Sequence, residues 1–178
     1  APLLAVGGSP DLVRVLRAAA SGREIATCAS DGEFLGSSEQ LIVWLDGFEA
    51  GGEGTDPVSC VSNLWKLIRL SQNLQSFSQK FRILLPTRAA QGENGTDAPF
   101  QAAFWGAARS LSIECPDLQI LLVDIAPDCD PARIFTELLP RLEAVFEEQD
   151  MLQARADGWF SPRIAALEAP APEEAASL

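Results

Sequence analysis

The chain repeats one local signal four times: a side-chain oxygen acceptor placed just ahead of a proline. The four instances are Ser9-Pro10, Asp56-Pro57, Asp97-Ala98-Pro99 and Asp130-Pro131. A serine or aspartate at the N-cap accepts a hydrogen bond from a backbone N–H that the helix leaves unpaired. Proline in the first turn removes a second such N–H. Each instance therefore predicts the start of a helix.

Apolar residues recur at helical spacing after the last three of these starts. They are Val58, Val61, Leu64, Trp65, Ile68 and Leu74 after Asp56; Phe100, Phe104, Ala107, Ala108 and Leu111 after Asp97; and Ile134, Phe135, Leu138, Leu139, Leu142, Val145 and Phe146 after Asp130. The small residues 106–108 indicate a helix that lies close against a sheet. Pro140 falls inside the last stripe, so it is expected to kink that helix or to divide it in two.

Short apolar runs separate the helices. They are Leu3–Val6, 24–28, 41–45, 82–85 and Leu118–Ile125. Several are apolar throughout, as is typical of strands that are covered on both faces. Their alternation with helices predicts an α/β fold with a mostly parallel sheet and right-handed crossovers. Near the end, Met151–Arg155 and 159–164 flank Ala156-Asp157-Gly158, which predicts a β-hairpin. Residues 47–55 are expected to form a glycine-rich loop.

Charge and residue types exclude several functions. The net charge is −12 and the only lysines are Lys66 and Lys80, which disfavours nucleic acid and anionic membranes as partners. No apolar run reaches the roughly 18 residues of a membrane span, and no basic leader is evident, so a cytoplasmic protein is expected. The four cysteines form no C-x-x-C pair and the chain has no histidine, so we expect free thiols and no metal site. These cysteines are Cys28, Cys60, Cys115 and Cys129.

The first strand-to-helix turn is where a sheet of this kind would bind a nucleotide. It begins Val6-Gly7-Gly8-Ser9-Pro10. A dinucleotide fingerprint counted from Gly7 requires glycines at positions 9 and 12, and this chain has Ser9 and Leu12 there. No G-K-[ST] phosphate loop occurs. A plain turn is the favoured interpretation, and a degenerate phosphate site is the alternative.

Groups for proton transfer are equally scarce, because the chain has neither histidine nor tyrosine. Asp46 and Asp124 follow or end predicted strands, and both are interpreted as caps or solvated ends rather than as catalytic groups. Ser110 and Ser112 have no histidine to activate them, and Lys66 and Lys80 are interpreted as solvated.

Two further groups of residues have structural interpretations. Arg109 and Glu114, close to Trp105, are expected to form a local surface pair, with contact to a neighbouring domain as the alternative. Trp44, Trp65 and Trp159 are expected to pack in the core or on the hairpin rather than to bind a ligand. The sequence therefore indicates no catalytic, cofactor-binding or metal-binding residue.

Four ordered motifs in the second half carry a family resemblance. They are residues 82–91 (RILLPTRAAQ), residues 100–116 (FQAAFWGAARSLSIECP), residues 121–124 (LLVD) and residues 157–163 (DGWFSPR). They resemble the "TRGAQ" strand, the "QAALWGLGRSLALEHP" helix, the strand after it and the "DGxRYVPRL" hairpin of polyketide synthase ketoreductases. The specific resemblance covers about residues 82 to 167; the first 80 residues agree only in the order of elements.

The resemblance implies a particular half of a ketoreductase. Those enzymes are tandem short-chain dehydrogenase folds, in which an N-terminal structural subdomain is a truncated Rossmann unit without cofactor. The C-terminal subdomain carries the NADPH loop and the Lys, Ser, Tyr and Asn machinery. Every matched motif belongs to the structural half, so no active-site residue can be carried over. The chain departs from the common pattern at Phe160 and Cys115, which we interpret as packing or surface positions.

We therefore expect residues 1–167 to form a non-catalytic, truncated Rossmann-like subdomain, followed by an Ala/Pro/Glu-rich linker or tail at 168–178. Its expected partners are adjacent domains of the same synthase: a catalytic ketoreductase half, or a C-methyltransferase, dehydratase or enoylreductase beside a pseudo-ketoreductase. Two alternatives remain. One is a divergent stand-alone Rossmann enzyme that uses NAD(P) or S-adenosylmethionine, and the other is an acidic adaptor unrelated to polyketide synthesis.

Overall fold

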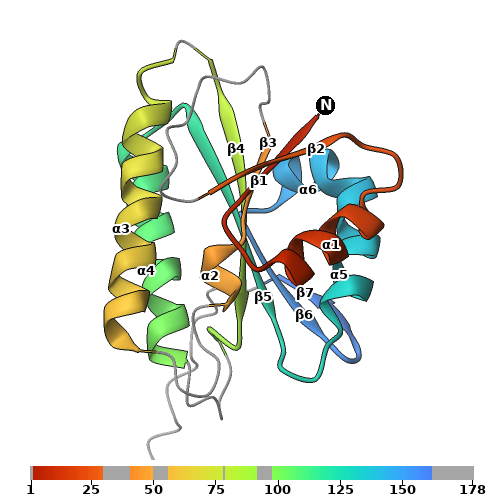
Figure 1. The fold of residues 1–178 in the computed structure, drawn as a ribbon. Helices are drawn as coiled ribbons and strands as arrows, with labels where there is room; N and C mark the ends of the chain where they lie inside the picture. Colours follow the sequence, from red (N-terminus) through yellow and green to blue (C-terminus); the bar gives the residue numbers. More distant parts are fainter. Residues whose placement is uncertain (1, 30–40, 50–55, 78, 92–97, 162–178) are drawn as a thin grey trace, which may run out of the picture.

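The described residues form a sheet of seven strands, seen in a computed structural model (Figure 1). The structure describes residues 2–29, 41–49, 56–77, 79–91 and 98–161. The strands are β1 (Leu3–Val6), β2 (Ile25–Cys28), β3 (Leu41–Trp44), β4 (Phe81–Arg88), β5 (Leu118–Ile125), β6 (Met151–Arg155) and β7 (Gly158–Phe160). Their order is β2-β1-β3-β4-β5-β6-β7, and only β7 runs antiparallel to its neighbour.

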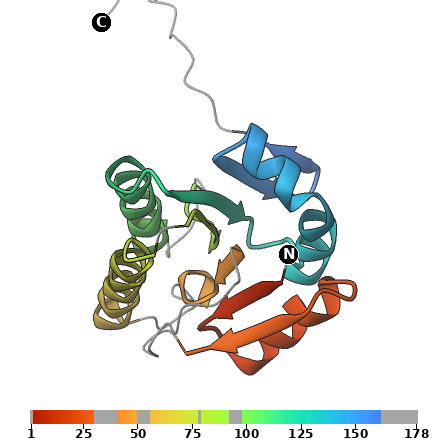
Figure 2. The same ribbon diagram turned by 90° about the horizontal axis from the view of Figure 1, so that it is seen from above.

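Helices cover both faces of this sheet. They are α1 (Pro10–Ala19), α2 (Asp46–Glu49), α3 (Pro57–Leu74), α4 (Ala98–Glu114), α5 (Pro131–Leu138), the 3-10 turn η1 (Leu139–Arg141) and α6 (Leu142–Glu148). Helices α3 and α4 lie side by side on one face, and α1, α5 and α6 lie on the other (Figure 2). The described chain is therefore a three-layered α/β sandwich of the Rossmann type, as the sequence predicted. It has one strand fewer beside β1 than the usual Rossmann order.

The proline-linked caps account for three helix starts. The side chains of Ser9, Asp56 and Asp130 accept hydrogen bonds from Leu12 N, Val58 N and Ala132 N, respectively. The fourth predicted cap, Asp97, lies outside the described residues, but α4 does begin at the next residue. Pro140 divides the last predicted helix as expected, since the 3-10 turn η1 separates α5 from α6.

The sheet carries a core on each face because its central strands are buried throughout. Side chains of β3 alternate between the two faces: Leu41 and Val43 pack towards α1 and α5, whereas Ile42 and Trp44 pack towards α3 and α4. All four are at most 4% exposed. This two-sided burial explains why the strand sequences lack polar alternation.

Three predicted boundaries are corrected by the structure. Strand β4 continues past 85 to Arg88, because it pairs with β5 over its whole length. Proline is tolerated at position 86 because the pairing with β3 ends at Leu84, so Pro86 has a neighbouring strand on one side only. The predicted loop at 47–55 begins with the short helix α2, and residues 50–55 lie outside the described part. Strand β7 ends at Phe160, and residues 162–164 of the predicted strand, like the predicted tail 168–178, are not described. None of the described helices is long and apolar enough to span a bilayer.

Candidate functional site

The strand order reverses at β1, which lies between β2 and β3. In open α/β sheets a ligand crevice forms at such a point, beyond the carboxyl ends of the strands. Here the turn after β1 contains Gly7 and Gly8, both with positive φ (71° and 81°). The residue that faces them is Asp46, the first residue of α2, just beyond the end of β3.

The Asp46 carboxylate lies directly on this turn. Its Oδ1 accepts a hydrogen bond from Gly8 N at 2.8 Å. A Cβ atom at Gly7 would lie 2.1 Å from the same oxygen, so only glycine fits beneath the carboxylate. Asp46 was expected to be a cap or a solvated strand end. Besides beginning α2, it binds the turn that in dinucleotide-binding folds approaches the pyrophosphate.

Two further backbone N–H groups at this turn also donate hydrogen bonds to other atoms of the protein. Gly7 N donates to Cys28 O (2.9 Å), Leu12 N donates to Ser9 Oγ (3.3 Å), and Pro10 has no N–H. A phosphate would have to displace a carboxylate of its own charge sign to reach Gly8 N. The shallow hollow beside the turn, about 390 Å³, is lined by Gly7, Gly8, Pro10, Val13, Arg17, Thr27, Cys28 and Ala29.

A second polar cluster lies at the carboxyl ends of β4 and β5 and centres on Asp124. The side chain of Asp124 is fully buried and accepts hydrogen bonds from Thr87 Oγ1 (3.1 Å), Ala90 N (2.7 Å) and Gln91 N (3.1 Å). Its Oδ2 also lies 3.5 Å from Nη1 of Arg155 on β6. The expectation of a solvated end is therefore wrong for Asp124, which caps two backbone N–H groups of the turn after β4 and is a buried ion-pair partner of Arg155.

This cluster joins elements that are far apart in the sequence. Trp105 Nε1 of α4 donates to Thr87 Oγ1 at 2.8 Å, and Thr87 in turn donates to Asp124. The backbone after β4 turns at Ala89, whose φ is +56°. Three of the four motifs noted in the sequence thus meet at this cluster: residues 82–91 supply Thr87, Ala90 and Gln91, residues 100–116 supply Trp105, and residues 121–124 supply Asp124. Together with Arg155 of β6, they hold β4, α4, β5 and β6 together.

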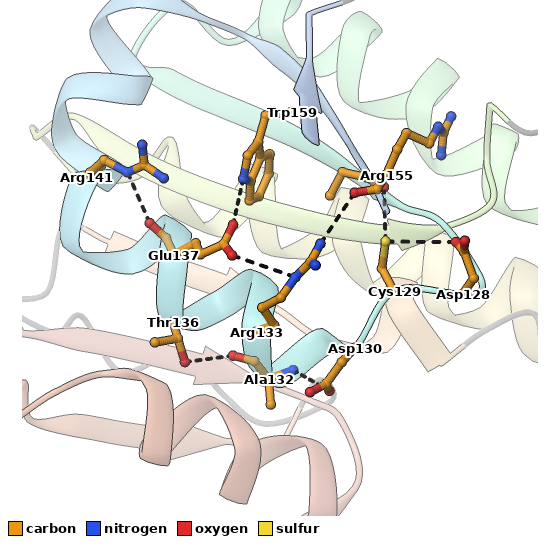
Figure 3. Close-up of polar contacts among 11 residues, drawn as sticks. Asp128, Cys129, Asp130, Ala132, Arg133, Thr136, Glu137, Arg141, Arg155 and Trp159 are labelled. Carbon is orange, nitrogen blue, oxygen red and sulfur yellow. Dashed lines mark hydrogen bonds and ion pairs between the residues drawn. The ribbon is translucent and has the colours of Figure 1, made fainter. Parts of the chain in front are cut away.

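Figure 3 shows how the hairpin is attached to α5. Trp159 Nε1 donates to Glu137 Oε2 at 2.9 Å, and Arg133 lies 3.6 Å from the same carboxylate. Trp159 also packs against the core on this face of the sheet. It therefore packs on the hairpin, as predicted.

The remaining predicted residues have mixed outcomes. Trp44 is fully buried, but Trp65 is 58% exposed on α3, so its expected core position is wrong. Arg109 and Glu114 do not form an ion pair in the described structure, because five residues place them far apart around α4. Instead, Arg109 Nη2 lies 3.3 Å from Met151 Sδ. The expected surface pair is therefore wrong.

The serines, lysines and cysteines that the sequence analysis interpreted as non-functional have ordinary surroundings. Ser110 is exposed, and Ser112 donates to Ala108 O. Lys66 donates to Asn63, and Lys80 is exposed. The four cysteines, all of them in the described part of the chain, form no disulfide. Burial raises the pKa of Cys60, and the pKa of Cys129 is raised by burial and by Asp128. Within the described ranges, no three Cys, Asp or Glu side chains are grouped to hold a metal ion.

These features define a truncated Rossmann-type unit, and comparison with solved structures narrows the fold further. A C2-type ketoreductase from a modular polyketide synthase is similar over 96% of this chain, with a TM-score of 0.72 and 18% identity. An A1-type ketoreductase is similar with a TM-score of 0.64 and 22% identity. A short-chain dehydrogenase from Rhodopseudomonas palustris is similar over 86% of this chain and 98% of its own, with a TM-score of 0.58 and 13% identity.

The fold is therefore that of ketoreductases and short-chain dehydrogenases. The chain spans only 42% and 39% of the lengths of the two ketoreductase structures. No family model matches the sequence, and no curated protein matches it.

Proposed function

We propose that this chain is the structural, non-catalytic subdomain of a polyketide synthase ketoreductase region. It would support a catalytic ketoreductase half or, in a pseudo-ketoreductase, a neighbouring C-methyltransferase, dehydratase or enoylreductase. The observation that carries the proposal is the Asp46 carboxylate on Gly8 N, at the turn where a cofactor phosphate would bind. The partial coverage of the ketoreductase structures and the four motifs support the same assignment.

The sequence adds a chemical argument. A ketoreductase of this fold transfers a proton from a tyrosine in Tyr-x-x-x-Lys, and this chain has no tyrosine and no histidine. The carboxylate at the end of β5, Asp124, is bound to two backbone N–H groups, a hydroxyl and an arginine. Such a carboxylate is occupied in holding the structure together.

A surface on α3 favours the proposed role of holding a neighbouring domain. Val58, Val61 and Trp65 are 72%, 66% and 58% exposed, and their spacing places them along one side of the helix. The 18 residues of α3 include no Asp or Glu, although the chain carries a net charge of −12. Exposed aromatic and aliphatic side chains on a helix without carboxylates favour an interface, because such side chains are typical of interface cores. We call Val58, Val61 and Trp65 the α3 stripe.

The α3 stripe yields a direct prediction. We expect the double variant Val61→Asp, Trp65→Asp to fold normally, because both side chains are exposed, and to lose affinity for the separately produced catalytic half by about 30-fold or more. Loss of one aromatic anchor at an interface typically costs about 2 kcal/mol or more. Association can be measured by calorimetry or by sedimentation.

The matched control is Ala18→Asp, an exposed position on α1 at the opposite face of the sheet. It should leave the affinity unchanged. Equal affinity for the double variant and the native chain would exclude the α3 stripe as the docking surface.

A further inference from the structure

A groove lies at the edge of the sheet opposite to Asp46 and Asp124. It has a volume of about 1080 Å³ and is lined by the amino-terminal ends of β4, β5 and β6 and by the last turns of α4. Ligands of open α/β sheets bind at the carboxyl ends of the strands. The position of this groove therefore points to a docking surface rather than to a reaction site.

The groove combines an apolar floor with a cationic rim. Leu118, Ile120 and Leu122 of β5 form part of the floor. The rim carries Lys80, Arg82 and Arg109, three of the chain's 13 cations, together with the carboxylates of Asp117 and Asp150.

The rim cations have no carboxylate partner in the described part of the chain. The three ion pairs found there all lie elsewhere. Arg82 instead lies over the ring of Phe146 at 5.7 Å, and Arg109 lies against the sulfur of Met151. In a chain with a net charge of −12, three cations without a carboxylate partner around one groove favour an anionic occupant.

The last described residue, Ser161, is held beside this groove, and an acidic segment follows it in the sequence. After β7, Ser161 Oγ donates to Gln149 Oε1 at 2.6 Å, and the next residues after Gln149, Asp150 and Met151, line the groove. The chain continues as PRIAALEAPAPEEAASL, residues 162–178. This segment contains apolar side chains, Ile164 and Leu167, followed by Glu168, Glu173 and Glu174.

We propose that residues 164–174 bind in this groove, with Ile164 and Leu167 on its apolar floor and the glutamates at the Lys80, Arg82 and Arg109 rim. Six residues lie between Ser161 and Glu168, and the resulting residue steps allow a reach of about 24 Å in an extended chain. Because the segment is tethered at the groove, its effective concentration there is in the millimolar range, so weak contacts suffice. This inference does not depend on the proposed ketoreductase role.

The lysine content makes a sharp test possible. A zero-length carbodiimide reagent links a carboxylate to a lysine amine in contact with it, and this chain has only Lys66 and Lys80. In the full chain we expect mass spectrometry to find amide links from Lys80 to Glu168, Glu173 or Glu174. Lys66, on α3, serves as the internal control and should form no such link.

Two further measurements make the test decisive. The variant Arg82→Gln, Arg109→Gln should lower the yield of links between Lys80 and the segment by about tenfold. Arg69→Gln, an exposed position on α3, should leave that yield unchanged. Absence of links from Lys80 to residues 168–174, equal links from Lys66, or an unchanged yield in the double variant would overturn the proposal. So would links found mainly between labelled and unlabelled copies in a mixture, since the proposed contact is within one chain.

Discussion

Replacing Asp124 by alanine is expected to lower the free energy of unfolding by about 3–5 kcal/mol, the largest effect of any polar substitution in this chain. The substitution leaves Ala90 N without its acceptor and leaves the partly buried Arg155 without its ion-pair partner. It also removes the acceptor of the Thr87 hydroxyl, which is buried. Denaturation in urea, followed by tryptophan fluorescence, measures the loss.

The matched control is Asp11→Ala. Asp11 forms an ion pair with Arg14 at 2.9 Å, but both side chains are about 80% exposed, so the change should stay below about 1 kcal/mol. If Asp124→Ala and Asp11→Ala had similar effects, the buried cluster would not be the junction that we describe. Changing Trp105 to phenylalanine tests the outer part of the cluster, because it removes the indole N–H that donates to Thr87 together with part of a buried ring.

Replacing Phe104 by alanine is expected to destabilise the fold by about 3–5 kcal/mol as well, through packing rather than charge. Phe104 is fully buried between α4 and the sheet, in the core that also contains Trp44 and Ile83. The cavity left by the ring would be only partly refilled, because neighbouring side chains on rigid strands relax little. Chemical denaturation monitored by circular dichroism gives this value independently of the tryptophans.

Ile113→Ala provides the control on the same helix. Ile113 is 83% exposed, so its truncation should change the free energy of unfolding by about 0.5 kcal/mol or less. A small effect at Phe104, or equal effects at the two positions, would contradict the assignment of the inner face of α4.

Local signals in the sequence were sufficient for much of this fold. The acceptor-proline pairs at Ser9, Asp56 and Asp130 predicted helix starts correctly, because a cap is formed by residues within one turn of each other. Pro140 likewise acts locally on its own helix. The apolar runs predicted the strands, since burial on both faces leaves no place for polar alternation.

The polar clusters could not be predicted in the same way, because their partners are distant in the sequence. Asp124 meets Arg155 only when β5 and β6 pair, and Asp46 meets Gly8 only when β3 lies beside β1. A lone aspartate between the apolar residues Val123 and Ile125 was a signal of burial that could have been used. The prediction for Trp65 failed for a different reason. Helical spacing identifies residues that share one side of a helix, but it does not identify the side that faces the core.

The proposed role rests on two independent features: the chain has neither histidine nor tyrosine, and a carboxylate occupies the turn that binds phosphate in dinucleotide-binding folds. Three of the four motifs that resemble those of ketoreductases contribute residues to the buried Asp124 cluster, where these residues stabilise the fold.

Calorimetric titration of the purified chain with NADPH tests this account most directly, with S-adenosylmethionine as a second ligand. We expect no saturable heat for either ligand up to about 1 mM, a limit that corresponds to a binding free energy weaker than about −4 kcal/mol. Saturable one-to-one binding of NADPH that is lost when Gly8 is changed to aspartate would place a cofactor on the turn and would contradict the account.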